Sequence, residues 1–479
     1  MSSCPGLAID LFLLAWVSVG LGCGTAAPRA ETPPSATGND PEAIRLLAGY
    51  RSELVASPVF GGQAYVLEVG PADAEAVVLV HGLGDSGSCD WYPILPALAS
   101  RYHVIAFDLP GFGRSTHAHD LYSPEAYAEF IHVLVGQRVR GAFNLVGHSM
   151  GGTISLLYAG RFPGDVKRLV LIDVAGILHH KAYVNFAVSA GLDNLLGMLA
   201  ATGKDLANVV MDATAQATSA ILPVSPDPTF VLKSDLLRST ILDTPVRIAA
   251  LATILENLAP AIAKVEAPTW ILWGRHDAVA SLRAGLLLKA RLPYAQLRIL
   301  ERAGHDPMST EADAVVDFLL QALATPKRPP FLRTPPGPFV LPERVGRCDG
   351  QSGVTFTGDY SDIDISGCWA VSLKGVRARS LNIRDSQVVV EDTRIESQAT
   401  ALEVKGSRVE LTACELAGDV AIDTDNSDLD MAGVELRGKR AAVHVTGASR
   451  LTFSVSKVDS PVQRRFVHEV LEPNAKDDL

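Results

Sequence analysis

The segment G-H-S-M-G-G at residues 147–152 constrains this chain more than any other feature. It directly follows an apolar run, A-F-N-L-V at 142–146, and precedes a helix-compatible stretch at 153–159. A G-x-S-x-G motif between a buried strand and a helix predicts a tight reversal that strains the serine backbone and lifts its hydroxyl above a sheet. Glycine on either side of the serine suits the close approach of the two backbones. The pattern predicts that Ser149 is a nucleophile.

A serine nucleophile requires a histidine base and an acid that orients the base, and after this type of turn the acid precedes the histidine in the chain. Asp277 and His305 stand in that order, and each follows an apolar run that predicts a strand, at 269–273 and 296–300. Because the carboxyl ends of parallel strands meet at one edge of a sheet, both side chains are expected to lie beside Ser149. We therefore predict Asp277 as the acid and His305 as the base.

Two other aspartates compete for the role of the acid. Asp173 ends a predicted strand at 168–172 and faces the same edge of the sheet, so it is the alternative acid. Asp108 opens the segment D-L-P-G-F-G-R-S at 108–115, but it precedes Ser149 in the chain, which is the wrong order for such a triad. The glycines and the proline of that segment predict a structural loop.

An acyl-transfer site also needs donors for the oxyanion that develops on the substrate. One predicted donor is the backbone N–H of Met150, at the start of the helix that follows the nucleophile. The second is the N–H of Leu83, in the segment H-G-L-G at 81–84, which follows a predicted strand at 76–80. His81 itself is expected to brace this loop through hydrogen bonds.

Taken in order, the motifs H-G-L-G, D-L-P-G-F-G-R-S, G-H-S-M-G-G, W-G-R-H-D and A-G-H resemble those of the α/β-hydrolase superfamily over about residues 45–325. The resemblance implies a mostly parallel sheet with helices on both faces and a helical cap at about 177–265 within a domain at 43–325. It also implies an enzyme that forms an acyl-enzyme intermediate, with no cofactor and no metal. A serine rather than an aspartate at 149 argues against epoxide hydrolases and haloalkane dehalogenases.

Carboxylic esters of small-molecule or lipid-like acyl groups are the substrates that this resemblance favours, because ester hydrolysis is the commonest chemistry on the fold. The same residues would serve a carbon–carbon bond hydrolase, an acyltransferase or a perhydrolase, so the fold alone does not choose among these activities. A non-catalytic binding or adhesion protein is the alternative from a different class.

The N-terminus predicts export. An apolar run at 11–22 has the length of a signal-peptide core and ends at Cys23, and residues rich in proline, alanine and threonine follow it. This arrangement resembles a bacterial lipoprotein signal (1–23) with lipidation at Cys23 and a flexible tether at 24–42. The expected location is the cell envelope or the medium, with membrane contact only through the lipid anchor. An uncleaved anchor is the alternative.

Composition narrows the choice of partners. The chain has 479 residues, which predicts two or more domains, and 48% of them are hydrophobic and 20% charged, as in ordinary globular proteins. Its formal net charge is −11 and it has no basic cluster, so it lacks the electrostatic footprint of a nucleic-acid-binding protein.

A proline-rich segment at 326–342 predicts a semi-rigid linker, and the sequence beyond it repeats. Short runs of alternating polarity recur every 20 to 22 residues, each beside a serine: Ser366, Ser386, Ser407, Ser427 and Ser449. This periodicity predicts an all-β solenoid at 343–465, of the right-handed parallel β-helix type, with a charged tail at 466–479. We expect this domain to bind a polysaccharide or a protein, or to act as a spacer.

Two details of the repeat region bear on its chemistry. Cys348 and Cys368 lie one repeat apart, a spacing that favours a disulfide in an exported protein. The acidic segment at 423–428 hints at calcium, but it lacks the glycine and the distal glutamate of an EF-hand loop, so its carboxylates are read as solvated turn residues.

Overall fold

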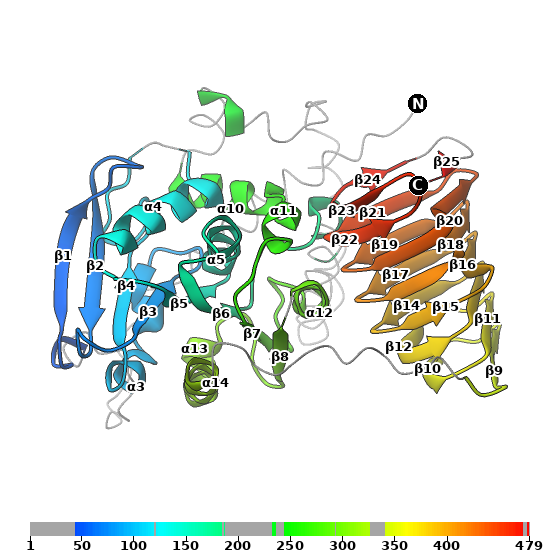
Figure 1. Cartoon of the computed structure of the whole chain (residues 1–479), viewed down its shortest axis with the longest axis horizontal. Coiled ribbons are helices and arrows are strands. Elements are labelled where there is room, and N and C mark those ends of the chain that lie inside the picture. The colour runs from blue at the N-terminus through cyan, green and yellow to red at the C-terminus, as the bar shows by residue number, and fades with distance from the viewer. Residues whose placement is uncertain are drawn as a thin grey trace, which may run out of the picture.

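The computed structural model describes residues 44–118, 121–183, 186, 232–235, 244–292, 294–325, 341–472 and 477–478. The predicted signal peptide with Cys23, the tether, most of the proline-rich linker and most of the predicted cap lie outside these residues. Figure 1 shows an α/β part built from the first two thirds of the chain and, beside it, a stack of strands built from the last third.

Eight strands form the sheet of the α/β part, and only the second in the chain runs opposite to the other seven. In order across the sheet they are β1 (Arg51–Ala56), β2 (Gln63–Val69), β4 (His103–Phe107), β3 (Ala76–Val80), β5 (Phe143–His148), β6 (Val166–Ile172), β7 (Thr269–Gly274) and β8 (Ala295–Leu300). The β1–β2 and β2–β4 pairs are antiparallel, and the other five are parallel. The predicted mostly parallel sheet is therefore confirmed. Strand β1 was not predicted because it is an almost fully exposed edge strand without a buried face.

Helices cover both faces of this sheet (Figure 1). One hydrophobic core includes residues of α4 (Pro124–Gly136), α5 (Met150–Arg161), α10 (Pro245–Leu255), α11 (Ala259–Ile262) and α12 (Leu282–Arg291). A second core, on the other face, includes residues of the 3-10 helix η1 (Gly87–Trp91) and of α3 (Leu95–Ala99), α13 (Pro307–Thr310) and α14 (Ala312–Ala324). Val78 belongs to the first core and Val77 to the second, as expected for a strand buried on both sides.

The C-terminal part is a 17-stranded sheet. Its strands are β9 (Val345–Asp349), β10 (Thr355–Asp359), β11 (Asp362–Ser366), β12 (Val371–Ala378), β13 (Ser380–Arg384), β14 (Gln387–Glu391), β15 (Arg394–Glu396), β16 (Thr400–Lys405), β17 (Arg408–Thr412), β18 (Glu415–Asp425), β19 (Asp428–Ala432), β20 (Glu435–Thr446), β21 (Arg450–Ser454), β22 (Ser456–Asp459), β23 (Arg464–Val467), β24 (Val470–Leu471) and β25 (Asp477–Asp478). Equivalent strands of successive repeats pair in parallel, so Val388, Val409, Leu429 and Leu451 lie in one buried row.

The repeated serines link successive repeats through hydrogen bonds. The hydroxyls of Ser407, Ser427 and Ser449 each accept a bond of 3.1 Å from the backbone N–H of the serine one repeat earlier. Ser407 and Ser427 also donate to the carbonyl two residues before them, at 2.7 Å. The side chains thus satisfy buried corner groups that would otherwise lack partners, which explains why serine recurs at this position. We call this set, together with Ser386, the serine ladder.

Ser366 does not belong to the ladder, contrary to the sequence-based alignment of the repeats. It is exposed at the end of β11 and pairs with Arg384, while Val371 rather than Cys368 pairs with Val388. The first repeat is out of step with the predicted alignment by two residues at Ser366 and by three at Val371, and its corner, at 367–370, is longer than the two-residue corner at 385–386. A disulfide joins Cys348 to Cys368 at this corner, with 6.4 Å between the Cα atoms.

Arg283 of α12 holds the C-terminal part against the α/β part. Its guanidinium donates to the Thr412 hydroxyl (2.7 Å) and to the carbonyls of Leu411 (3.0 Å) and Asp430 (2.8 Å), and it pairs with the Asp430 carboxylate (2.9 Å). Farther along the helix, Gly433 has a φ of 63° and a Cβ added to it would come within 3.0 Å of the Leu287 Cα, so a larger residue there would be strained. The two parts therefore share a tightly packed interface.

A second contact lies where the chain leaves β6. The His179 N–H donates to the Ser454 hydroxyl (2.8 Å), and the His179 ring lies near the rings of His180 and His468. The Nδ1 atom of His179 accepts from the Lys181 N–H (3.3 Å), which suits a neutral ring. Burial, with smaller effects from the neighbouring histidines, lowers the pKa of His179 to about 3, and burial lowers that of His468 to about 4.

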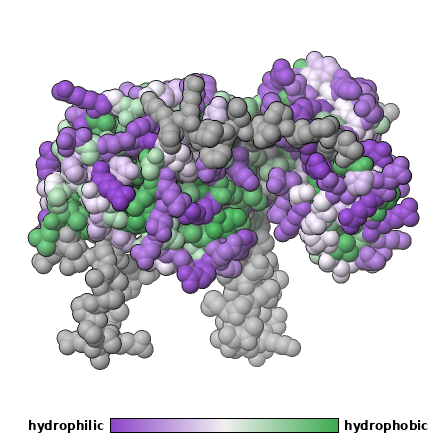
Figure 2. Space-filling model, turned by 60° about the horizontal axis from the view of Figure 1, so that its bottom comes forward, coloured by the Kyte–Doolittle hydropathy of each residue, from purple (hydrophilic) through white to green (hydrophobic). Residues whose placement is uncertain are grey.

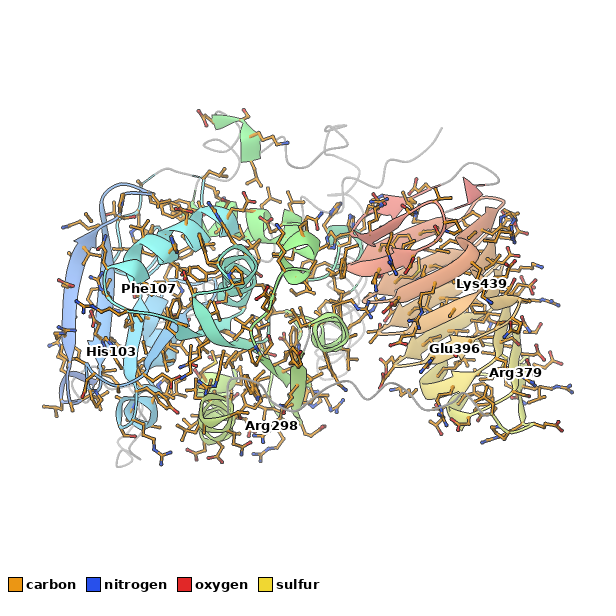
Figure 3. All side chains as sticks on the ribbon, viewed as in Figure 1. His103, Phe107, Arg298, Arg379, Glu396 and Lys439 are labelled. Carbon is orange, nitrogen blue, oxygen red and sulfur yellow. A yellow bond between two sulfur atoms is a disulfide. The ribbon has the colours of Figure 1, made fainter. Side chains whose placement is uncertain are left out.

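Figures 2 and 3 show the outer surface of the molecule. On the face in Figure 2, hydrophobic residues gather toward the middle of the molecule, whereas the surface of the C-terminal part is predominantly hydrophilic. Arg379, Glu396 and Lys439 point outward from the edge of the C-terminal strands that is remote from the α/β part (Figure 3).

Substituting Arg283→Met should lower the free energy of unfolding by about 1–3 kcal/mol, because several buried acceptors lose their donor. Urea unfolding measured by circular dichroism checks this expectation. Lys374→Met is the control, since the Lys374 side chain is 59% exposed and its ion pair with Glu391 should contribute less than about 1 kcal/mol. Equal effects of the two substitutions would contradict the role of Arg283 at the interface.

The buried histidines predict a loss of stability in mild acid. Because the pKa of His179 is lower in the folded protein than in the unfolded chain, the unfolded chain binds more protons below about pH 6.5, and the free energy of unfolding falls as the pH falls toward 4. His179→Asn should reduce the fall between pH 7 and pH 5 by up to about 2 kcal/mol, measured by urea unfolding at each pH. His132→Asn, at a side chain that is 41% exposed, is the control. An unchanged pH dependence in His179→Asn would refute the assignment.

Candidate active site

Ser149 occupies a strained turn between β5 and α5. Its φ is 52° and its ψ −119°, a backbone conformation that residues other than glycine rarely adopt. The Ser149 N–H donates to the Ile172 carbonyl at 3.0 Å, which ties the turn to the end of β6. The residue is only 5% exposed. The structure thus places the predicted nucleophile at the carboxyl edge of the central strands.

Two glycines make this turn possible. A Cβ added to Gly147 would lie 2.3 Å from the Gly151 carbonyl oxygen, and a Cβ added to Gly151 would lie 2.1 Å from the Val80 carbonyl oxygen. Atoms cannot approach this closely, so the helix and the two strands can meet only where both side chains are absent. The predicted reason for the glycines is therefore observed.

His305 connects Ser149 to Asp277. Its Nε2 lies 2.9 Å from the Ser149 Oγ, and its Nδ1 lies 2.8 Å from the Asp277 Oδ2. A carboxylate beside Nδ1 favours the histidine tautomer that is protonated at Nδ1. In this tautomer Nε2 is free to accept the proton of the serine hydroxyl. The other oxygen of Asp277 accepts from the N–H groups of Val279 (2.7 Å) and Ala280 (2.8 Å), which fix its orientation. The structure brings the three predicted residues together in the geometry of proton abstraction from a serine.

The alternative acid, Asp173, does not contact His305. It follows β6 with a positive φ of 45°, is fully buried, and accepts the Gly274 N–H at 2.7 Å. Burial, followed by the negative charge of Asp277, raises the pKa of Asp173 well above its ordinary value. This shift favours the protonated form of Asp173, beside the aspartate that orients His305.

His148 has a role in the site that the sequence did not reveal. Its Nε2–H donates to the backbone carbonyl of His305 at 2.8 Å, so the residue before the nucleophile holds the loop of the base. Burial lowers the pKa of His148 to about 4, which keeps the ring neutral and suited to this bond. The position of His148 in the motif was visible in the sequence. Its bond to His305 could not be predicted, because the two residues are 157 positions apart.

The two predicted oxyanion donors belong to segments that adjoin Ser149. A Cβ added to Gly82 would come within 3.0 Å of the Ser149 Cβ, so the loop with Leu83 passes directly beside the nucleophile. Met150 is the first residue of α5, where backbone N–H groups have no partner within the helix. Neither the Leu83 nor the Met150 N–H donates to an acceptor in the described part of the chain.

His81 and Asp108 support this loop, as the sequence indicated. The Nδ1 of His81 lies 2.7 Å from the Gly82 carbonyl oxygen, and its Nε2 accepts the Leu109 N–H at 2.9 Å. The buried Asp108 carboxylate accepts from the Ser88 N–H (2.7 Å) and from the Arg114 Nε (2.9 Å). Asp108 thus ties two loops together and lies outside the Ser149–His305–Asp277 chain.

Residues 75–312 match the protein family described as alpha/beta hydrolase fold. Together with the sheet order and the serine turn, the match shows that this part of the chain has the α/β-hydrolase fold. Lipase 1 of Psychrobacter immobilis is 28% identical over 268 residues, which are 54% of this chain and 79% of that protein. The 2-hydroxy-6-oxononadienedioate/2-hydroxy-6-oxononatrienedioate hydrolase of Comamonas testosteroni is 28% identical over 271 residues, 53% of this chain and 88% of that protein.

A crystal structure of a putative lipase (lip1) from Acinetobacter baumannii AYE aligns with a TM-score of 0.43 and 26% identity, over 62% of this chain and 99% of that one. The family match and the sequence relatives support hydrolase activity. Within the described residues, no helix is long and apolar enough to cross a membrane, and no group of three or more His, Cys, Asp or Glu side chains is placed to hold a metal ion.

Substituting Gly151→Ala should disrupt the site, because the added methyl group would collide with the Val80 carbonyl. We expect the free energy of unfolding to fall by about 3 kcal/mol or more, measured by urea unfolding. Gly164→Ala is the matched control, since a Cβ there meets no atom within 4 Å. A Gly151→Ala protein as stable as the control would contradict the close contact of α5 with β3.

Proposed function

We propose that this protein is an exported serine hydrolase that cleaves carboxylic esters through Ser149, His305 and Asp277. The observation that carries the proposal is the continuous hydrogen-bonded chain from the Ser149 hydroxyl through the His305 ring to the Asp277 carboxylate. Such a chain activates a weak nucleophile without a metal or a cofactor.

In the proposed reaction, the Ser149 Oγ attacks the acyl carbonyl while the His305 Nε2 takes its proton. The N–H groups of Leu83 and Met150 stabilise the oxyanion of the tetrahedral intermediate. Collapse of this intermediate releases the alcohol, which receives the proton from His305, and leaves an acyl group on Ser149. His305 then deprotonates water, which attacks the acyl-enzyme and restores the serine.

The substrate class follows from the relatives and the site together. The similarity to a protein named Lipase 1 supports lipid-like acyl groups as substrates. A carbon–carbon bond hydrolase is the second candidate, because the Comamonas testosteroni hydrolase matches over most of its own length. Consumption of 2-hydroxy-6-oxononadienedioate, followed by its absorbance, distinguishes this candidate from an esterase.

The proposal also includes export with lipid attachment at Cys23. It further includes a parallel β-helix at 343–465. The Cys348–Cys368 disulfide supports export, because such bonds persist in oxidising compartments. Parallel pairing of strands about 20 residues apart, with apolar side chains in buried rows, supports the β-helix. Its right-handed sense is part of the proposal.

The purified protein should hydrolyse p-nitrophenyl esters, and Ser149→Ala should lower kcat/KM by at least about 10³-fold because the nucleophile is lost. Asp277→Asn should lower kcat about 10⁴-fold, since an amide there favours the wrong histidine tautomer. A series from acetate to palmitate measures the chain length that the site prefers. Ser100→Ala, at an exposed serine, is the control.

A fluorophosphonate probe tests the nucleophile independently of the substrate. Labelling of the parent protein but not of Ser149→Ala, without ester hydrolysis, would move the proposal to the carbon–carbon bond hydrolase. Absence of both labelling and hydrolysis in the folded parent protein would overturn the proposed serine chemistry.

A further inference from the structure

A groove of about 790 Å³ follows the corners of the C-terminal repeats. The serine ladder lies along it, and exposed side chains from successive repeats stand beside these serines. The residues that line it are Trp369, Asp385, Ser386, Gln387, Gly406, Ser407, Arg408, Asn426, Ser427, Asp428, Ala448, Ser449, Arg450 and Glu472. The groove therefore spans the repeats from the first long corner to the C-terminal strands.

Trp369 forms one end of the groove and is unusual in its exposure. Trp369 is 62% exposed, whereas Trp91, Trp270 and Trp273 are buried in the α/β part. The backbone of Trp369 is held rigidly: its N–H donates to Gln351 (3.1 Å), its carbonyl accepts from Gly353 (3.0 Å), and the disulfide lies next to it. An exposed indole offers a flat apolar face on which a flat, partly apolar ligand can stack.

The rim of the groove offers planar polar groups at regular intervals. Gln387, Arg408, Asp428 and Arg450 are paired in register in adjacent strands, so they stand at steps of about 4.8 Å. Such amide, guanidinium and carboxylate groups each present two hydrogen-bonding atoms in one plane, which suits neighbouring hydroxyls of a ligand. The Arg408 guanidinium makes no hydrogen bond or ion pair within the described residues.

The net charge of the groove argues against a polyanionic ligand, and its bonded backbone N–H groups argue against a peptide strand. Three acidic residues (Asp385, Asp428 and Glu472) and two basic ones line the groove, a balance of −1 that gives a polyanion no net attraction. A peptide added as a strand would need free backbone groups. In the serine ladder the corner N–H groups are already bonded to hydroxyls, as between Ser386 and Ser407.

We propose that this groove binds a neutral oligosaccharide, with one sugar ring stacked on Trp369 and the hydroxyls of the following sugars bonded to Gln387, Arg408 and Asp428. A sugar ring combines an apolar face of C–H groups with a rim of hydroxyls, which matches an exposed indole beside planar polar side chains. This binding does not rest on the proposed ester hydrolysis.

The other end of the groove reaches the α/β part. Glu472 accepts from the Arg450 Nε (3.0 Å) and lies 3.7 Å from the Lys181 Nζ. Lys181 stands in the segment 177–183, which leaves β6 beside the candidate active site. A glycan in the groove is therefore held next to the hydrolase part of the same chain.

Isothermal titration of the full-length protein with cellohexaose, xylohexaose, mannohexaose and laminarihexaose tests the site. We expect at least one of them to bind and to change the tryptophan emission. Trp369→Ala and Arg408→Ala should each weaken that binding at least about tenfold, while Trp369→Phe, which keeps a ring, should weaken it by less than about threefold. Arg379→Ala is the control, because Arg379 lies on the remote edge (Figure 3).

The same variants should keep the ester hydrolysis and the fluorophosphonate labelling of the parent protein. A wrong proposal of glycan binding and a wrong proposal of serine hydrolysis therefore give different results. Absence of binding to all four neutral sugars at about 5 mM would overturn the proposal. Binding of hexagalacturonate in preference to the neutral sugars would overturn it as well, and so would binding that Trp369→Ala leaves unchanged.

Discussion

The contact of the turn at Ser149 with the end of β3 is the constraint on which the candidate site depends. Gly151 lies against the Val80 carbonyl with no room for a side chain, and Gly82 lies against the nucleophile from the neighbouring loop. This closeness fits the strained backbone of Ser149, whose φ is 52°, and brings the loop of Leu83 beside the residue that precedes Met150. The nucleophile and the candidate oxyanion donors thus lie in adjoining segments because of one packing requirement of the backbone.

A second constraint separates two aspartates at the same edge of the sheet. Asp277 accepts three hydrogen bonds, from two backbone N–H groups and from His305. Asp173 accepts one, from Gly274, and burial beside Asp277 raises its pKa. Two adjacent buried carboxylates cannot easily be charged together, which favours the protonated form of Asp173. The 2.8 Å contact between the Asp277 Oδ2 and the His305 Nδ1 decides which aspartate orients the histidine.

The features of the fold and of the site that depend on a local sequence pattern could be predicted. The buried strands, the glycine turn and the positions of Ser149, Asp277 and His305 at strand ends follow from motifs and apolar runs. The bond from His148 to the His305 carbonyl and the contacts of Arg283 join residues more than 120 positions apart, and no local pattern records them. The serine period was visible, but the displaced first repeat was not, because the pairing of Ser366 with Arg384 and of Val371 with Val388 depends on how the first repeat stacks on the next.

The interface between the two parts lies close to both carboxylates, which argues against a C-terminal part that is only a spacer. Helix α12, which carries Arg283, begins five residues after Asp277, and the segment bonded to Ser454 through His179 begins shortly after Asp173. Tyr183, at the end of that segment, is partly buried, and burial followed by the charge of Asp277 raises its pKa. The elements that contact the C-terminal strands are therefore the ones that follow Asp277 and Asp173 in the chain. Because Lys181 of the same segment pairs with Glu472 at the end of the groove, one segment joins the groove to the α/β part.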